Sequence, residues 1–381
     1  MKKFILKTCL FLCPIVILIV VNFSFLRNGG ELYSPTKLSI ENQSNRALIG
    51  LAYSDPVIQF KHKNIQSRKP EIIALGTSRV LQFRDIYFTE PHKFYNAGRS
   101  ITKIKDLEPF VKHYPITQPK IIILGLDQDF FSAQYDSLSS TGFNNFESTS
   151  KFSGRLLSSS RNFTADLFNS KINWEFLTKK HPSNRIGYTA LTHNEGFRVD
   201  GSYLYGRLLL SENDDYMFSD VLNRIKKQKP RFAPAEINRA AVDVYEKFLG
   251  LCAAENIYLI TFLPPYSHRV YDELAEKSDQ YPYIFQLHDT LAPLCKKYNY
   301  PLYDFSDLKT LGANDFETID GFHGSETAYF KIAHLIFQNE PKFKNILDAD
   351  KVRYFSKTPF SARQLLPELD EIHPKPSTIA Q

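Results

Sequence analysis

The sequence predicts an α/β fold, with a central parallel sheet covered by helices and one membrane-spanning helix in front of it. Short apolar runs bounded by Gly or Pro, typical of buried strands, alternate with helical patterns. Near-continuously apolar strands that alternate with helices indicate a parallel sheet covered on both faces. The stretch 8–26 is apolar on all sides and close to the ~20 residues that cross a bilayer core.

The N-terminal segment combines positive charge with this apolar run. Lys2, Lys3 and Lys7 precede residues 8–26, which contain no acidic or basic side chain. Cytoplasmic flanks of membrane helices are rich in Lys and Arg, so the chain after Arg27 is expected outside the cytoplasm. No small-residue cleavage site follows the run, which favours an uncleaved anchor over a removed signal peptide. We therefore predict a single-pass membrane protein whose main domain is periplasmic or extracellular.

The five expected strands and four expected helices follow one another in α/β order. A Gly closes the first and third strands, and a Pro opens the third and fifth. The strands are expected at 71–76, 93–96, 119–125, 257–263 and 301–305, and the helices at 101–113, 234–255, 283–297 and 325–338.

An irregular stretch interrupts this order and sets the domain boundaries. Residues 132–161 are rich in Ser, Asn and Phe, and mixed sequence continues to about 234, too long for an ordinary loop. We interpret it as an inserted lid or subdomain. The predicted segments are an anchor at 1–27, a connector at 28–68, a first α/β part at 69–131, the insertion at 132–234, a second α/β part at 235–340 and a tail at 341–381.

Composition excludes several classes of protein. Of the 381 residues, 43% are hydrophobic and 23% charged, which favours a packed core over disorder. The net charge of +6 comes from scattered basic residues, so no nucleic-acid groove is expected. The histidines and cysteines show no metal-binding spacing, and we expect neither a metal site nor a cofactor. Cys252 and Cys295 could pair in an oxidising compartment or remain buried thiols.

Ser78 is the first candidate for chemistry. It follows the first expected strand within Gly76-Thr77-Ser78 and is expected to open a helix. Taken alone, such a serine is an ordinary helix cap. However, ligands of open α/β sheets bind outside the carboxyl ends of the strands, where Ser78 would lie. A helix N-terminus there would also offer N–H groups to a developing oxyanion.

Asp320 and His323 are the second candidates. Their three-residue spacing recurs by chance in a chain with ten histidines, so its value depends on context. The pair lies between the last expected strand and the last expected helix, at the same sheet edge as Ser78. An aspartate can hold one imidazole nitrogen while the other accepts the proton of a serine. Ser78, His323 and Asp320 are therefore predicted as nucleophile, base and orienting carboxylate.

Three further positions could assist at this edge. Gly98 and Ser100 follow the second strand and Asp127 follows the third, where donors to an oxyanion could lie or where ordinary turns could form. An ionised Asp127 can only accept hydrogen bonds. Arg79, next to Ser78, could meet an anionic substrate or form a surface salt bridge.

In these motifs the chain resembles the SGNH (GDSL-like) hydrolase superfamily. It is most similar to a membrane-anchored bacterial branch, which includes alginate and peptidoglycan O-acetyltransferases and the D-alanine transfer protein of teichoic acids. Gly76-Thr77-Ser78 matches the nucleophile block and Asp320-x-x-His323 the C-terminal block, whereas Thr77 and Asp127 stand where the family has Asp and Asn. The resemblance covers about residues 68–340 without the insertion and implies a flavodoxin-like sheet.

Motifs and resemblance together predict an extracytoplasmic serine-dependent O-acyltransferase or esterase, with acetyl as the expected acyl group. The expected acceptor is a cell-surface or exported polysaccharide, or water. The resemblance also implies a polytopic membrane protein as acyl donor. A catalytically inactive, glycan-binding or assembly component of a polymer export machinery is the alternative. A lipid esterase is a third hypothesis.

Overall fold

The chain divides into two compact units, each described here by itself. The structure, a computed structural model, describes residues 1–113, 120–139, 152–174, 184–209, 214–340, 343 and 345–366. One unit comprises residues 1–63 and 146–199, and the other comprises 64–145 and 200–381. The predicted insertion at 132–234 therefore contributes to both. Parts of that insertion (140–151, 175–183 and 210–213), and the end of the predicted tail (367–381), lie outside the described residues.

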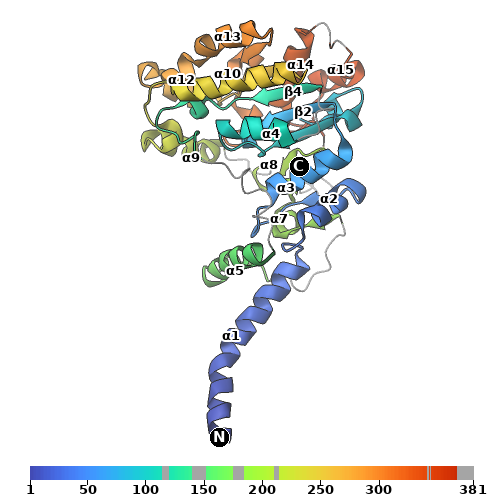
Figure 1. The fold of residues 1–381 in the computed structure, drawn as a ribbon, viewed down its shortest axis with the longest axis vertical. Coiled ribbons are helices and arrows are strands. Elements are labelled where there is room, and N and C mark those ends of the chain that lie inside the picture. Colours follow the sequence, from blue (N-terminus) through green and yellow to red (C-terminus); the bar gives the residue numbers. More distant parts are fainter. Residues whose placement is uncertain are drawn as a thin grey trace, which may run out of the picture. The chain divides into compact units, whose positions relative to one another are not determined.

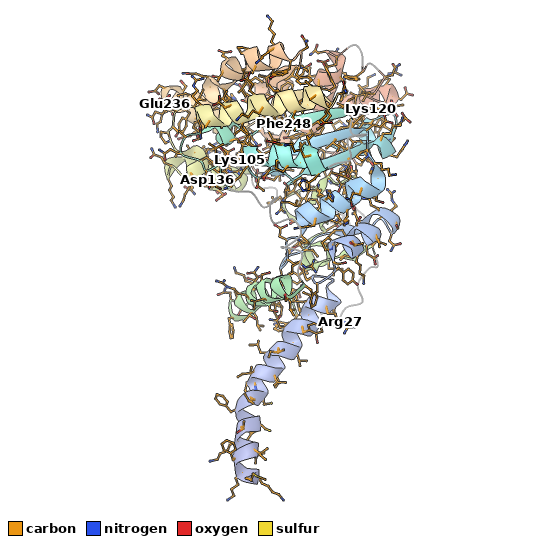
Figure 2. All side chains as sticks on the ribbon, in the orientation of Figure 1. Arg27, Lys105, Lys120, Asp136, Glu236 and Phe248 are labelled. Carbon is orange, nitrogen blue, oxygen red and sulfur yellow. The ribbon has the colours of Figure 1, made fainter. Side chains whose placement is uncertain are left out.

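The first unit begins with one long apolar helix. Helix α1, Lys2–Asn28, is long and apolar enough to cross a membrane, and its apolar window is not buried. Most of its side chains project without neighbours, and Arg27 lies in its last turn (Figure 2). The other elements of this unit are α2 (Pro35–Ser44), β1 (Leu48–Ile49), most of α3 (Val57–Arg68), α5 (Phe152–Phe168), β5 (Arg185–Ile186), α7 (Tyr188–His193) and β6 (Glu195–Phe197).

Aromatic packing around the end of α1 forms the core of the first unit. The Phe25 ring centroid lies 4.4 Å from that of Phe163 and 5.4 Å from that of Tyr188. The buried Glu31 carboxylate accepts the backbone N–H groups of Tyr53 and Tyr188. Burial raises the pKa of Glu31 above its ordinary value, and these hydrogen bonds offset only part of that rise. Residues 28–63, most of the expected connector, thus belong to this packed unit.

A five-stranded parallel sheet forms the second unit, as predicted (Figure 1). Its spatial order is β3-β2-β4-β8-β9, and all four neighbouring pairs are parallel. Numbered along the chain, this order is 2-1-3-4-5, so the chain reverses direction across the sheet between β2 and β4. Ligands of such sheets bind at the carboxyl ends of the strands beside this reversal. The strands are β2 (Ile72–Gly76), β3 (Phe94–Gly98), β4 (Ile121–Gly125), β8 (Tyr258–Leu263) and β9 (Leu302–Asp304).

Alternating strand residues pack against helices on opposite faces of the sheet. Ala74, Ile123 and Phe262 share one buried cluster with residues of the last two helices, α14 (Glu326–Gln338) and α15 (Ala349–Lys357). Thr261 points to the other face, because side chains alternate along a strand, and there it bonds Tyr245 of α10 (Arg239–Ala254) at 2.8 Å. Figure 1 shows α10 and α4 (Leu107–His113) lying across this second face. Both faces are therefore covered, which explains why the strands are almost entirely apolar.

The helices of the second unit are α4 (Leu107–His113), α8 (Gly206–Leu209), α9 (Asp214–Lys226), α10 (Arg239–Ala254), α11 (His268–Ala275), α12 (Pro282–Phe285), α13 (Leu287–Lys297), α14 (Glu326–Gln338) and α15 (Ala349–Lys357), and the short strand β7 is Tyr203–Tyr205. The helices expected at 234–255, 283–297 and 325–338 are present as α10, as α12 with α13, and as α14, whereas α8, α9, α11 and α15 were not among the predictions. The helix expected at 101–113 is shorter and begins at Leu107. Cys252 and Cys295 are buried free thiols, one of the two alternatives left open by the sequence.

A candidate active site at the carboxyl end of the sheet

The turn after β2 presents Ser78 at the edge of the sheet. Gly76 ends the strand with φ +155°, and a Cβ there would lie 2.7 Å from the carbonyl oxygen of Gly125 on the neighbouring strand. Only glycine allows this close approach of the two backbones. Ser78 then begins a single 3-10 turn, Ser78–Val80, capped by the Thr77 hydroxyl. The prediction that Ser78 opens an α-helix is therefore wrong, and a helix macrodipole does not act on it.

The three residues predicted as a triad lie in one hydrogen-bonded row. Ser78 Oγ is 2.9 Å from His323 Nε2, although the two residues are 245 positions apart in the chain. His323 Nδ1 is 2.8 Å from Asp320 Oδ2. The His323 and Asp320 side chains are 17% and 26% exposed, and Ser78 is half-buried, so solvent and small molecules can reach the row.

The loop that carries Asp320 and His323 is held by its own hydrogen bonds. Asp320 Oδ1 accepts the backbone N–H groups of Phe322, at 3.0 Å, and His323, at 2.7 Å. Gly321 takes φ +80°, and its carbonyl oxygen accepts the N–H of Ser267 at 2.9 Å. One oxygen of Asp320 therefore fixes the turn while the other contacts the imidazole. This pre-organises the ring relative to Ser78.

Charge in this loop favours the protonation state that a serine nucleophile needs. Burial raises the pKa of Asp320, but the opposing effects of the His323 charge and of hydrogen bonds from His323 and Phe322 outweigh it, so the pKa lies below its ordinary value. An ionised Asp320 accepts a hydrogen bond from Nδ1–H of His323. The neutral ring then keeps its lone pair on Nε2, where it can accept the proton of Ser78.

Two aromatic side chains that the sequence analysis missed border His323. The ring centroid of Tyr205, on β7, lies 5.9 Å from that of His323, and Phe322 packs edge-on at 5.1 Å. Burial and the nearby Asp320 charge raise the pKa of Tyr205, which keeps its hydroxyl protonated. Tyr205 lies in an aromatic run without motif spacing, so no local signal identified it.

Asp127 stabilises the turn that carries Ser78 through a hydrogen bond to Thr77. It is fully buried, and its Oδ2 accepts the Thr77 hydroxyl at 2.8 Å. The same hydroxyl oxygen accepts the backbone N–H of Arg79. Arg231, which forms an ion pair with Asp129 at 3.1 Å, approaches Asp127 to 3.9 Å. Asp127 thus acts as an acceptor that positions Thr77, in place of the oxyanion-donor role proposed for this loop.

Gly98, the last residue of β3, and Ser100, just after it, are engaged in hydrogen bonds of their own turn. The N–H of Gly98 donates to Asn96 Oδ1 at 2.8 Å, and the N–H of Ser100 donates to the carbonyl of Ala97 at 3.1 Å. Asn96 itself bonds the carbonyl oxygens of Val80 and Phe83. These contacts tie β3 to the segment that follows Ser78, and they leave neither N–H free to serve an oxyanion.

Arg79 lies inside the second unit, with 1% of its surface exposed. Its guanidinium donates to Gln128 Oε1 at 2.7 Å and to the carbonyl oxygens of Pro264 and Pro265 at 2.8 and 2.9 Å. It also lies 4.3 Å from the centre of the Tyr266 ring. The structure therefore uses Arg79 to join the loops after β2, β4 and β8, in place of the substrate contact or surface salt bridge considered from the sequence.

Neither the possible metal-binding side chains nor the comparisons with known proteins add evidence on the reaction. Within the described ranges, no group of three or more His, Cys, Asp and Glu side chains is arranged to hold a metal ion. No family model matches this chain, and no curated protein sequence matches it. The case for a function consequently rests on the row formed by Ser78, His323 and Asp320 and on the sheet edge that presents it.

Proposed function

We propose that this protein is a membrane-anchored, extracytoplasmic serine acyltransferase or esterase of SGNH-like type. The observation that carries the proposal is the hydrogen-bonded row from Ser78 Oγ through His323 to Asp320 Oδ2. The 2-1-3-4-5 strand order, which flavodoxin-like sheets share, supports the SGNH-like assignment. A nucleophile, a base in hydrogen-bond reach and a group that orients the base are the parts that nucleophilic acyl transfer needs.

The reaction follows from the roles of the three side chains. Ser78 Oγ attacks the carbonyl carbon of an acyl donor while His323 Nε2 takes its proton. His323 then gives this proton to the leaving oxygen, and the acyl group remains as an ester on Ser78. In the second half-reaction His323 removes a proton from an acceptor hydroxyl, whose oxygen attacks the ester and releases Ser78. Asp320 stays ionised throughout and stabilises the imidazolium.

The oxyanion needs a donor other than the residues that the sequence offered for this role. Because the N–H groups of Gly98 and Ser100 are engaged, we assign the backbone N–H of Ser78 as the first donor. It belongs to the nucleophile itself and follows the carboxyl end of β2. One well-placed donor contributes ~10²–10³ in rate.

The substrate assignment rests on the anchor and on the resemblance. Helix α1 would hold the enzyme where surface glycans are made or exported, with the N-terminus in the cytoplasm. The acceptor would be a hydroxyl of such a glycan, or water in an esterase, and the donor a polytopic membrane protein that carries acetyl groups. Tyr205, which lies in the predicted insertion and borders His323, would form part of a lid over the acceptor.

The experiment is trapping of the acyl-enzyme. Full-length protein in detergent is mixed with an activated acetyl ester, and the peptide that contains Ser78 is analysed for acetylation. We expect acetyl on Ser78 and release of the leaving group, both abolished by Ser78→Ala. Ser356→Ala is the matched control, because that serine lies on the surface of α15 and bonds only a carbonyl of its own helix.

The alternative, an inactive glycan-binding component, is favoured by the structural use of Gly98, Ser100 and Asp127. It predicts no acetylation of Ser78 and equal polymer binding by the parent and the Ser78→Ala variant. That result would overturn the enzymatic proposal. A preference for long-chain esters in the same assay would instead indicate a lipid esterase.

A further inference from the structure

Large apolar side chains are exposed in the first unit outside α1. On α5, Leu157 is 75% and Phe168 76% exposed, and Phe152 at its start is 54% exposed. Trp174, a few residues after α5, is 50% exposed. Burying such side chains is worth about 1.5–3 kcal/mol each, so a group of them on one short segment indicates a surface that is covered in use.

This segment is fixed to the C-terminal end of α1. Asn22 Nδ2 donates to Ser160 O at 3.2 Å and to Thr164 Oγ1 at 2.9 Å. The Phe25 ring packs on Phe163 at a centroid distance of 4.4 Å. Figure 1 shows α5 branching away from α1 at this end. A bilayer that α1 crosses would therefore have its surface near α5, since Asn22 and Phe25 lie close to the end of the apolar run.

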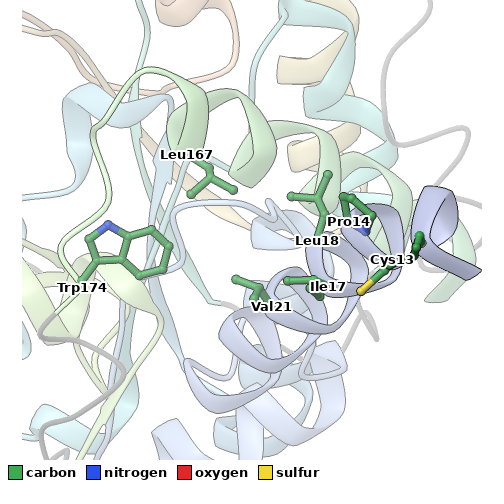
Figure 3. A pocket seen from close by; sticks show the side chains of 8 residues that line it. Cys13, Pro14, Ile17, Leu18, Val21, Leu167 and Trp174 are labelled. Carbon is green, nitrogen blue, oxygen red and sulfur yellow. The ribbon is translucent and has the colours of Figure 1, made fainter.

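An apolar groove of about 540 Å³ continues from α5 along α1 (Figure 3). Figure 3 shows Leu167 and the Trp174 indole facing α1, which supplies the other wall. Among the residues that the structure describes, no charged side chain lines this groove, so it suits a hydrocarbon chain rather than a polar ligand. Its lining includes Cys13, Ile17, Leu18, Val21, Leu167 and Trp174.

The chemistry of the segment matches a lipid–water interface. Tryptophan is enriched at the level of the lipid headgroups, where its ring is apolar and its N–H is hydrated. Interfacial helices combine apolar residues with basic ones, and α5 exposes Arg161 between Leu157 and Phe168. A protein partner is less well supported, because the groove is continuous with the side chains of α1 that would face lipid.

We propose that α5 and Trp174 lie in the outer lipid–water interface and that the groove between them and α1 holds a lipid acyl chain. The proposal rests on α1 standing in a bilayer and is independent of the chemistry at Ser78. It gives the first unit a second membrane contact, which restrains rotation of the anchored chain about α1.

Trp174 allows a direct test, because it is the only tryptophan in the chain. Full-length protein is placed in lipid nanodiscs whose acyl chains are brominated, and its fluorescence is compared with that in unbrominated discs. We expect blue-shifted emission and strong quenching by bromine, since an interfacial indole meets the upper acyl chains. Strong quenching by aqueous iodide with none by bromine would overturn the proposal. If neither bromine nor iodide quenched Trp174, a second copy of the chain or another protein would cover it, and this result would also overturn the proposal.

Variants separate α5 from a nonspecific effect of the anchor. The double substitution Leu157→Ser with Phe168→Ser should weaken bromine quenching of Trp174 and shift its emission to the red. Ile40→Ser is the matched control, because Ile40 is a 55% exposed apolar residue on α2. Circular dichroism checks that each variant is folded. Unchanged bromine quenching in a folded double variant would refute the interfacial role of α5.

Discussion

Replacing Asp320 by Asn is the sharpest test of the proposed row of side chains. An asparagine can keep its Oδ1 in place to accept the backbone N–H groups of Phe322 and His323, so the turn should survive. Its amide nitrogen would however face His323 Nδ1, where the carboxylate oxygen now lies at 2.8 Å. Because both groups cannot donate, Nδ1 must give up its proton, and the ring then carries the proton on Nε2. A protonated Nε2 cannot accept the proton of Ser78.

The expected size of this effect follows from the lost interactions. A hydrogen bond to a charged group contributes about 1.5–3 kcal/mol. The wrong tautomer adds to this loss, and in serine proteases the same exchange lowers kcat ~10⁴-fold. Asp320 is 26% exposed, so water can replace part of its contribution here. We therefore expect a loss of roughly 10³-fold, which corresponds to about 4 kcal/mol at 1.36 kcal/mol for each tenfold change.

The assay is acetyl-ester turnover by the full-length protein, with kcat and KM determined separately. The loss should appear in kcat, because Asp320 stabilises the transition state rather than the bound substrate. Asp348→Asn is the matched control, since Asp348 also accepts two backbone N–H groups but caps α15. An Asp320→Asn variant that melts like the parent and keeps more than roughly a tenth of its kcat would refute the reasoning, because that loss is far below the effect of a wrong tautomer.

Three further predictions concern stability. The pKa of Asp320 is lowered in the folded protein, so the stability that its ionised form contributes is present above the ordinary carboxyl pKa and lost as the pH falls through the folded value. The difference in unfolding free energy between the parent and Asp320→Asn, measured in urea, should therefore shrink between pH 6 and pH 3. A difference that stays constant over this range would contradict the prediction. Gly76→Ala should lower the unfolding free energy by about 2 kcal/mol and reduce turnover, because the new Cβ meets a carbonyl oxygen. The control is Gly154→Ala, which should be neutral or slightly stabilising because a Cβ there meets nothing within 4 Å. Arg79→Lys should lower the unfolding free energy by about 2–3 kcal/mol, because an ammonium cannot reproduce the forked contacts of the guanidinium. A raised KM with an unchanged melting temperature would instead indicate that Arg79 contacts the substrate.

Local patterns in the sequence were sufficient to place most of the sheet. The runs at 71–76, 119–125 and 257–263 contain β2, β4 and β8, because strands buried on both faces are apolar at nearly every position. The parallel arrangement followed from their alternation with helices. The same reasoning placed Ser78 and His323 at one edge, since the carboxyl ends of parallel strands meet there. Helix α1 was equally clear, because an uninterrupted apolar segment of this length forms one long helix that could cross a bilayer.

Local patterns failed where a backbone conformation or a partner depends on distant residues. Ser78 was expected to open a helix, but Thr77 and its bond to Asp127 hold a single 3-10 turn there. Gly98 resembled an oxyanion donor until the structure showed its N–H bound to Asn96. Tyr205 carried no signal, since its approach to His323 comes from a separate segment of the chain.

The sequence by itself determined which segments form the sheet and which residue types could carry acyl transfer. Apolar periodicity and spacing are local properties, and they can be read without knowing the fold. Only the tertiary structure decided that Ser78 Oγ lies 2.9 Å from His323 Nε2 and that Arg79 and Asp127 are structural. A hydrogen bond depends on tenths of an ångström and on competition among all nearby donors and acceptors, and both are settled only when the whole chain has packed.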